Sequence, residues 1–176
     1  MHTSRYMMLV AGAAMLFASP ALAGPGSPTA ATAQANTKAQ IVEPLTLTKK
    51  GDLNFGTIVK TSSLSATTPV TLNLNNAGTL GGCTAGSGLL CSGATTASSF
   101  QAAGTAGQLV YVYTNPTETM ASGSNNLVFT PNLAGPVTLD ASTGLVNFGV
   151  GGSIDVAKGT PPGVYAGTMD VTVDYN

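Results

Sequence analysis

The chain has 176 residues, of which 43% are apolar and only 7% carry a charge. Its one histidine and its one arginine are His2 and Arg5, so the rest of the chain offers no cluster of cations that could neutralise nucleic acid phosphates. These features exclude a nucleic acid-binding protein. The 22 glycines and the many Thr, Ser and Asn side chains are typical of an extracellular β-protein surface.

The first 23 residues predict a secretory signal peptide. Arg5 supplies its positive charge, residues 7–18 supply an apolar segment, and Ala21-Leu22-Ala23 matches a cleavage site. This apolar segment is too short to span a bilayer, and no later stretch reaches the roughly 18 consecutive apolar residues that a membrane span needs. We therefore expect an exported protein without an integral membrane span, in the periplasm, at the cell surface or outside the cell.

Residues 24–40 predict a flexible N-terminal arm, because they are nearly uncharged and rich in Pro, Ala, Thr and Gly. Small apolar residues recur there at every second position, a period that excludes an amphipathic helix. Two interpretations stay open: an extended segment able to act as a strand, or a disordered spacer, since alanine is a poor strand former. The alternating residues are Ala31, Ala33, Ala35, Ala39 and Ile41, with Thr37 interrupting.

Residues 41–176 are expected to form one domain built of short strands, because apolar and polar residues alternate between frequent turn residues. The first two strands, around Leu45–Leu47 and Leu53–Thr57, flank residues 49–52, which we expect to turn the chain into a hairpin or bend. Further strands are expected at residues 70–74, 109–113, 127–129, 137–139, 145–150 and 153–156, with Gly151 and Gly152 separating the last two.

Cys83 and Cys91 are the only cysteines, and they lie in a stretch rich in Gly, Ser and Thr. Two closely spaced cysteines in an exported chain predict a disulfide. The alternatives are a redox pair or a metal site, but zinc would lack its third and fourth ligands in a chain without histidine. A loop this short gains only about 2–3 kcal/mol from closure, so we expect the bridge to restrain a mobile loop or hairpin tip.

Two further segments, residues 109–113 and residues 164–175, complete the predicted fold. Val110 and Val112 alternate with Leu109, Tyr111 and Tyr113, which predicts a central strand with two apolar faces. At the C-terminus, alternation from Val164 to Tyr175 predicts one long antiparallel strand. No segment has a convincing helical period, so the chain predicts an all-β fold, a β-sandwich of antiparallel strands.

Several motifs carry a resemblance to a known family. They are residues 44–48 with 52–58, residues 148–156, and residues 162–168 with 171–175. On these residues the chain resembles a bacterial family catalogued as domain of unknown function 4402, over nearly all of the chain after the signal peptide. The closing pattern, Gly-x-Tyr followed by an alternating strand with a near-terminal Tyr, is more distantly similar to spore coat protein U and to fimbrial subunits of chaperone–usher systems.

The second resemblance implies an immunoglobulin-like sandwich that is incomplete in one chain. Its groove would be filled first by a periplasmic chaperone and then by the N-terminal arm of the next subunit, so the implied partners are a chaperone and further copies of the chain. The implied acceptor edge is Val171, Val173 and Tyr175. The implied donor arm is residues 29–40, with Ala31, Ala33, Ala35 and Ala39 as its alternating apolar residues.

Two classes of function follow from these features. The first is an exported structural protein without an active site, a pilin-like surface or fibre subunit that assembles by strand addition. The second is an autonomous exported binding module, for carbohydrate or for surface adhesion, with Tyr111, Tyr113 and Tyr165 as a stacking platform. All three tyrosines lie on apolar alternating faces, which favours a place in or beside the core instead.

An enzyme is the third class, and the sequence argues against it. Nucleophilic catalysis usually needs a base, and no histidine remains after the signal peptide. Asp170 and Asp174 share one strand face, but they would lie about 13 Å apart, beyond the range of paired glycosidase carboxylates. We therefore expect no catalytic activity, no cofactor and no metal site.

Overall fold

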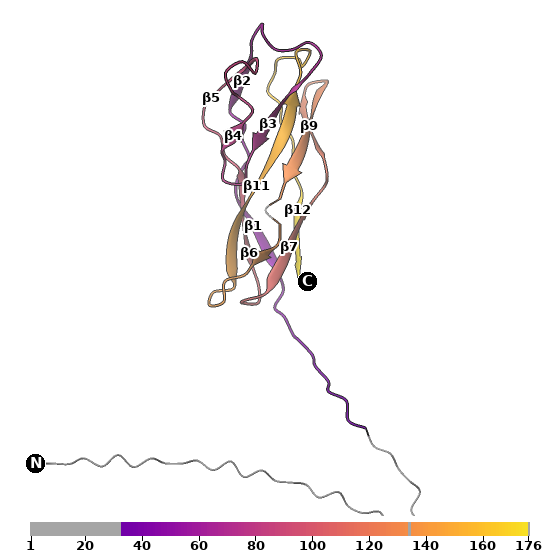
Figure 1. The fold of residues 1–176 in the computed structure, drawn as a ribbon. Helices are drawn as coiled ribbons and strands as arrows, with labels where there is room; N and C mark the ends of the chain where they lie inside the picture. Colours follow the sequence, from indigo (N-terminus) through magenta and orange to yellow (C-terminus); the bar gives the residue numbers. More distant parts are fainter. Residues whose placement is uncertain (1–32, 134, 176) are drawn as a thin grey trace, which may run out of the picture. The chain divides into compact units, whose positions relative to one another are not determined.

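The computed structural model describes residues 33–133 and 135–175. The predicted signal peptide, the first part of the arm and Ala31 lie outside the described residues. All twelve regular elements are strands, every ladder between them is antiparallel, and the described residues contain no helix, which confirms the predicted all-β sandwich (Figure 1). Consequently no described helix could cross a membrane. The described residues from Gln40 onward form one compact unit, and the arm before it forms another.

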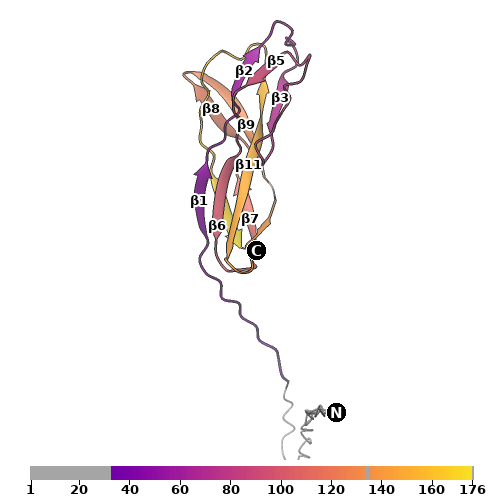
Figure 2. The same cartoon turned by 90° about the vertical axis from the view of Figure 1, so that its left-hand side faces the viewer.

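Two sheets face each other in the half of the sandwich that holds the C-terminus (Figures 1 and 2). The first sheet contains β1 (Thr46–Gly51), β6 (Ser98–Ala103) and the first half of β11 (Leu145–Val156). The second contains β10 (Val137–Thr138), β7 (Leu109–Thr114) and β12 (Val171–Tyr175). Their inner faces bury one apolar cluster, the lower core, made of Phe100, Ala102, Val110, Val112, Leu139, Phe148 and Val150.

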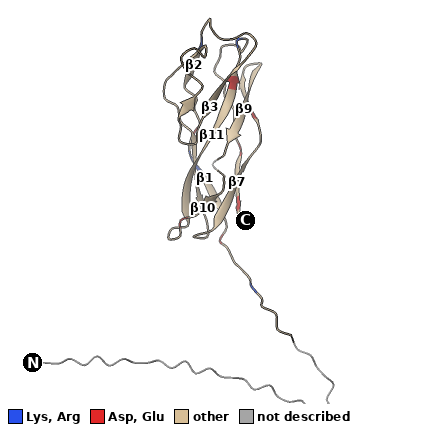
Figure 3. Ribbon diagram, in the orientation of Figure 1, with Lys and Arg blue, Asp and Glu red and all other residues tan. Residues whose placement is uncertain are grey.

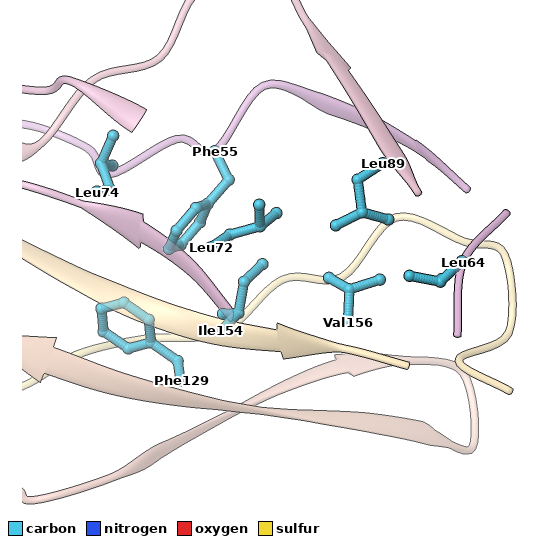
Figure 4. Close-up of a cluster of buried hydrophobic side chains, with 8 residues drawn as sticks. All are labelled: Phe55, Leu64, Leu72, Leu74, Leu89, Phe129, Ile154 and Val156. Atoms are coloured by element: carbon cyan, nitrogen blue, oxygen red, sulfur yellow. The ribbon is translucent and has the colours of Figure 1, made fainter. Parts of the chain in front are cut away.

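The other half of the sandwich has its own apolar cluster, the upper core. The second half of β11 joins a sheet with β3 (Val70–Leu74), β4 (Leu80–Gly81), β8 (Glu118–Ser122) and β9 (Asn125–Asn132). A two-stranded ribbon, β2 (Thr57–Lys60) and β5 (Leu89–Ser92), packs against it. The buried residues of this core are Phe55, Leu64, Leu72, Leu74, Leu89, Phe129, Ile154 and Val156 (Figure 4).

The predicted turn at residues 49–52 is wrong. Lys49 and Lys50 lie inside β1, and the chain keeps its direction through an Asn54–Thr96 bridge into β2. Both lysine side chains are exposed, and an edge strand tolerates such charges. The irregularity that looked like a turn is a β-bulge between Lys49 and Gly51 in the ladder with β6.

The predicted break at Gly151 and Gly152 is also wrong, because β11 is one strand of twelve residues that includes both glycines. A β-carbon on Gly151 would lie 2.8 Å from the Asn75 carbonyl carbon and even closer to the carbonyl oxygen of Leu74. A β-carbon on Gly152 would overlap the Phe129 ring. The glycines therefore let neighbouring segments approach β11 closely, so that one strand can serve both cores.

The C-terminal strand is shorter than the alternation predicts. Within residues 164–175, only β12 forms a ladder with another strand. Val164 is 87% exposed, and Ala166 makes an isolated bridge to Ala121 of β8. The close approach of Gly167 to the backbone at Thr119 shows that this segment lies against β8. The sequence pattern does not predict β8 itself, because the polar residues of this strand show no clear alternation with apolar ones.

Candidate strand-addition edge

β12 is an edge strand of its sheet. It pairs with β7 from Val171 opposite Thr114 to Tyr175 opposite Val110, and no described strand pairs with its other edge. The outward-pointing backbone N–H and C=O groups of such an edge are a template on which another strand can add. The sequence prediction that Val171, Val173 and Tyr175 belong to an accepting edge concerns this strand.

A second free edge borders the same core. β1 pairs with β6 alone among the described strands. Leu45 and Leu47 from this side, and Val171 and Val173 from β12, all pack against the lower core and all remain partly exposed. Two edges from opposite sheets thus leave apolar side chains of one core incompletely covered, which is the geometry that an added strand can complete.

Tyr175 joins the two edges at the end of the sandwich. Its hydroxyl donates to the carbonyl oxygen of Glu43 (2.8 Å) and accepts from the backbone N–H of Thr105 (2.8 Å). Gly104 makes room for it, since a β-carbon there would overlap the tyrosine hydroxyl. This role of Tyr175 as a clamp was not predicted, because the partner carbonyl lies 132 residues away in the sequence.

The segment that leads from the arm into β1 is held by further polar contacts. The backbone N–H of Glu43 donates to the Thr105 hydroxyl (2.6 Å), and the Gln40 side-chain amide donates to that of Gln108 (2.8 Å). Ile41, between them, is 94% exposed. Residues 40–43 therefore lie beside the β6–β7 turn, at the end where β12 finishes.

The described part of the predicted donor arm, residues 33–40, has no regular secondary structure. Ala33, Ala35 and Ala39 are all exposed. Because these residues belong to no helix or strand, their backbone N–H and C=O groups are available to pair with a partner strand.

Cys83 and Cys91 form the disulfide that the sequence predicts, with their Cα atoms 5.9 Å apart. Cys91 lies in β5 opposite Ile58, and both sulfur-bearing side chains pack against the upper core. The bridge therefore braces the β2–β5 ribbon from its inner side, and it does more than restrain a mobile tip.

The tyrosines of β7 lie on the outer face of their sheet. The core face of β7 is taken by Val110 and Val112, whereas Tyr113 is 53% exposed and its ring lies 6.4 Å from that of Tyr111, with an interplanar angle of 21°. A place in the core is thus wrong for Tyr113. Tyr165 lies in the segment before β12 and donates to the Pro161 carbonyl oxygen (2.9 Å).

Among the residues that the structure describes, no group of acidic and cysteine side chains is placed to hold a metal ion. Asp170 and Asp174 are both exposed. Hydrogen bonds lower the pKa of Asp140 well below its usual range: the Ser142 hydroxyl contributes most, followed by the backbone N–H groups of Thr143 and Ser142. These contacts hold the turn before β11 and keep the exposed Asp140 carboxylate ionised.

Comparison with known proteins gives one match. No curated protein and no solved structure matches the chain. The family model described as "Domain of unknown function (DUF4402)" matches residues 45–175. The matched region begins at Leu45, just before β1, and ends with the last residue of β12, so it contains both free edges and excludes the arm. Because the match covers well over half of the sequence, this chain belongs to the DUF4402 family.

Proposed function

We propose that this protein is an exported, non-catalytic structural subunit that assembles into a pilin-like fibre or surface layer by strand addition. The observation that carries the proposal is the free edge of β12, which borders an apolar core whose side chains stay partly exposed. The accepted strand is the N-terminal arm of another copy. The Cys83–Cys91 disulfide and the predicted signal peptide support assembly in an oxidising compartment outside the cytoplasm.

The alternation of the arm suits the edge. In antiparallel pairing with β12, Ala31 can lie opposite Tyr175 and Ala35 opposite Val171, which places Ala33 opposite Val173. All three alanines then face the lower core, and the polar residues between them face solvent. Alanine buries little area at roughly 25 cal/mol per Å², so backbone hydrogen bonds, each worth about 1 kcal/mol, supply much of the binding.

Deleting the arm should abolish assembly. We expect the secreted mature chain to form polymers and a variant lacking residues 24–39 to stay monomeric, because the deletion removes the donor strand and leaves the clamp at Glu43 intact. Size-exclusion chromatography with light scattering on periplasmic protein measures this. A peptide of residues 29–40 should bind the monomeric variant and raise its melting temperature.

Substitutions within the arm provide the matched control. Ala33→Asp and Ala35→Asp place charges toward the core and should prevent polymers, whereas Gln34→Asp and Asn36→Asp place the same charges toward solvent and should not. Monomers from every variant, including the unaltered chain, together with a peptide that fails to bind, would refute assembly by strand addition.

A second candidate function rests on the outer face of β7, where the exposed Tyr113 lies beside Tyr111 and, across the ladder, beside Thr172. Aromatic rings next to hydroxyl groups can bind the apolar faces and the hydroxyls of sugars. If this surface binds carbohydrate, Tyr113→Ala should abolish signals on a glycan array while Val128→Ala, which alters a similarly exposed residue of β9, leaves them unchanged. Glycan binding that survives Tyr113→Ala would exclude the surface.

A further inference from the structure

The β2–β5 ribbon lies toward the end of the sandwich opposite the C-terminus (Figure 1), and we call this ribbon, together with the loop after β11, the tip. On its outer face Val59 and Leu90 lie directly opposite each other in the ladder, and they are 50% and 63% exposed. The disulfide and the buried Leu89 hold the ribbon against the upper core. Lys60 ties the loop after β11 to the ribbon by donating to the carbonyl oxygens of Lys158 and Thr160. The exposed apolar pair therefore sits on a firmly supported surface.

The opposite end, where the arm joins, also exposes apolar side chains. We call this the root end: residues 40–45, the β6–β7 turn and the turn before β11. Ile41 is 94% exposed, and Val42 and Leu145 are each 39% exposed. Exposed apolar side chains thus gather at both ends of the long axis, and each group offers area that a partner could bury.

The two ends differ in their balance of charge: the tip carries lysines together with an aspartate, and the root end is acidic (Figure 3). The charged residues of the root end are Glu43 and Asp140, both exposed, and the exposed Asp174 lies near it at the end of β12; none of the described root-end residues is a lysine. At the tip, Lys60 and Lys158 outnumber Asp155, whose carboxylate accepts from the Thr71 hydroxyl. A root end placed against a tip brings opposite charges together, whereas two root ends placed together would repel.

The direction of β12 decides which ends meet. β12 finishes at the root end, where Tyr175 bonds Glu43, so an arm that pairs antiparallel with β12 runs toward the tip of the accepting copy. In the pairing described above, Gln40 comes level with Ala166, which bridges to Ala121 in the upper half of the sandwich. The domain that follows the arm in the donor copy then lies at the tip of the accepting copy.

The other free edge leads to a different assembly. An arm that pairs antiparallel with β1 runs toward the root end of the accepting copy, because β1 starts there. Two root ends would then meet, and Glu43 and Asp140 of one copy would face their equivalents. The charges oppose this arrangement and favour addition to β12.

We propose that the root end of one copy docks on the tip of the next copy, with Ile41 and Val42 against Val59 and Leu90 and the acidic root facing Lys60 and Lys158. This contact rests on the proposed function and deepens it, because it assigns the surface that fixes successive subunits end to end. It also supplies binding area that an alanine-rich arm lacks. The occupant of the tip is a second copy of this chain.

Leu90→Glu tests the contact on the secreted mature chain. It should raise the protein concentration needed for polymers about tenfold, because it puts a charge into the apolar centre of the contact. Val128→Glu is the matched control, since Val128 is 56% exposed on β9, a strand that does not pair with the β2–β5 ribbon, and it should leave assembly unchanged. The two variants should melt at the same temperature as the unaltered chain.

Charge reversal gives a second, independent test. Glu43→Lys and Lys158→Glu should each weaken polymerisation, and a chain that carries both substitutions should polymerise again. Because apolar side chains also contribute to the contact, polymerisation should depend less on salt concentration than a purely electrostatic contact would. The peptide of residues 29–40 should bind the arm-deleted Leu90→Glu variant as tightly as it binds the arm-deleted parent. Full assembly by Leu90→Glu and no recovery in the double reversal would overturn the end-to-end contact while leaving strand addition intact. Polymers that persist without the arm would instead overturn the proposed function.

Discussion

Gly151→Ala should lower the free energy of unfolding by about 3 kcal/mol. The added methyl group would meet the carbonyl oxygen of Leu74 and lie 2.8 Å from the carbonyl carbon of Asn75. Both are backbone atoms at the end of β3, and they cannot move aside as a flexible side chain can. We therefore expect the melting temperature to fall by roughly 10 °C, measured by circular dichroism on the monomeric, arm-deleted protein.

Gly159→Ala is the control for this prediction. No atom lies within 4 Å of a β-carbon at Gly159, and its backbone does not adopt positive φ. The substitution should be neutral, or slightly stabilising because it restricts the unfolded chain. Equal melting temperatures for the two alanine variants would contradict the close packing of β3 against the middle of β11.

Removing the disulfide by Cys83→Ser together with Cys91→Ser should lower the free energy of unfolding by about 2–3 kcal/mol. The bridge restricts the unfolded chain, and both half-cystines pack against the upper core. The loss should be concentrated in the β2–β5 ribbon, which pairs with no other strand among the described residues. Hydrogen exchange should therefore accelerate at Thr57–Lys60 and stay slow in β7.

Chemical reduction of the unaltered protein is the control for the serine variant. It breaks the same bond without placing hydroxyl groups beside the core, so it should give the same pattern of exchange with a slightly smaller loss of stability. Uniform acceleration over all strands would show that the bridge stabilises the sandwich as a whole. Since Leu90 is next to Cys91, either treatment should also weaken the end-to-end contact.

The two proposed surfaces differ in how far they could be predicted. The strand that holds Val171, Val173 and Tyr175 was predictable, because their alternation is a local pattern. The exposed apolar pair at the tip was not predictable. Val59 and Leu90 are ordinary strand residues in the sequence, and only the ladder between β2 and β5 places them side by side on an outer face. The clamp of Tyr175 on Glu43 was equally hidden, since it joins the two ends of the domain.

The errors of prediction share one cause. The lysines at 49–50 resembled a turn, and the glycines at 151–152 resembled a break, because charge and glycine usually interrupt strands. At the free edge of β1 the lysines reach solvent, and in β11 the glycines admit neighbouring backbone and the Phe129 ring. Each residue suits a strand only because of segments that are distant in the sequence.

The sequence by itself determined the fold class, the disulfide and the family, because alternation, cysteine spacing and motifs are properties of short segments. Tertiary structure decided which edges stay free, that β11 serves two cores, which faces of the tyrosines and of Leu90 meet solvent, and that Lys60 and Lys158 lie at the end away from Glu43 and Asp140. These features depend on ladder register and strand direction, which bring together residues that no local pattern relates.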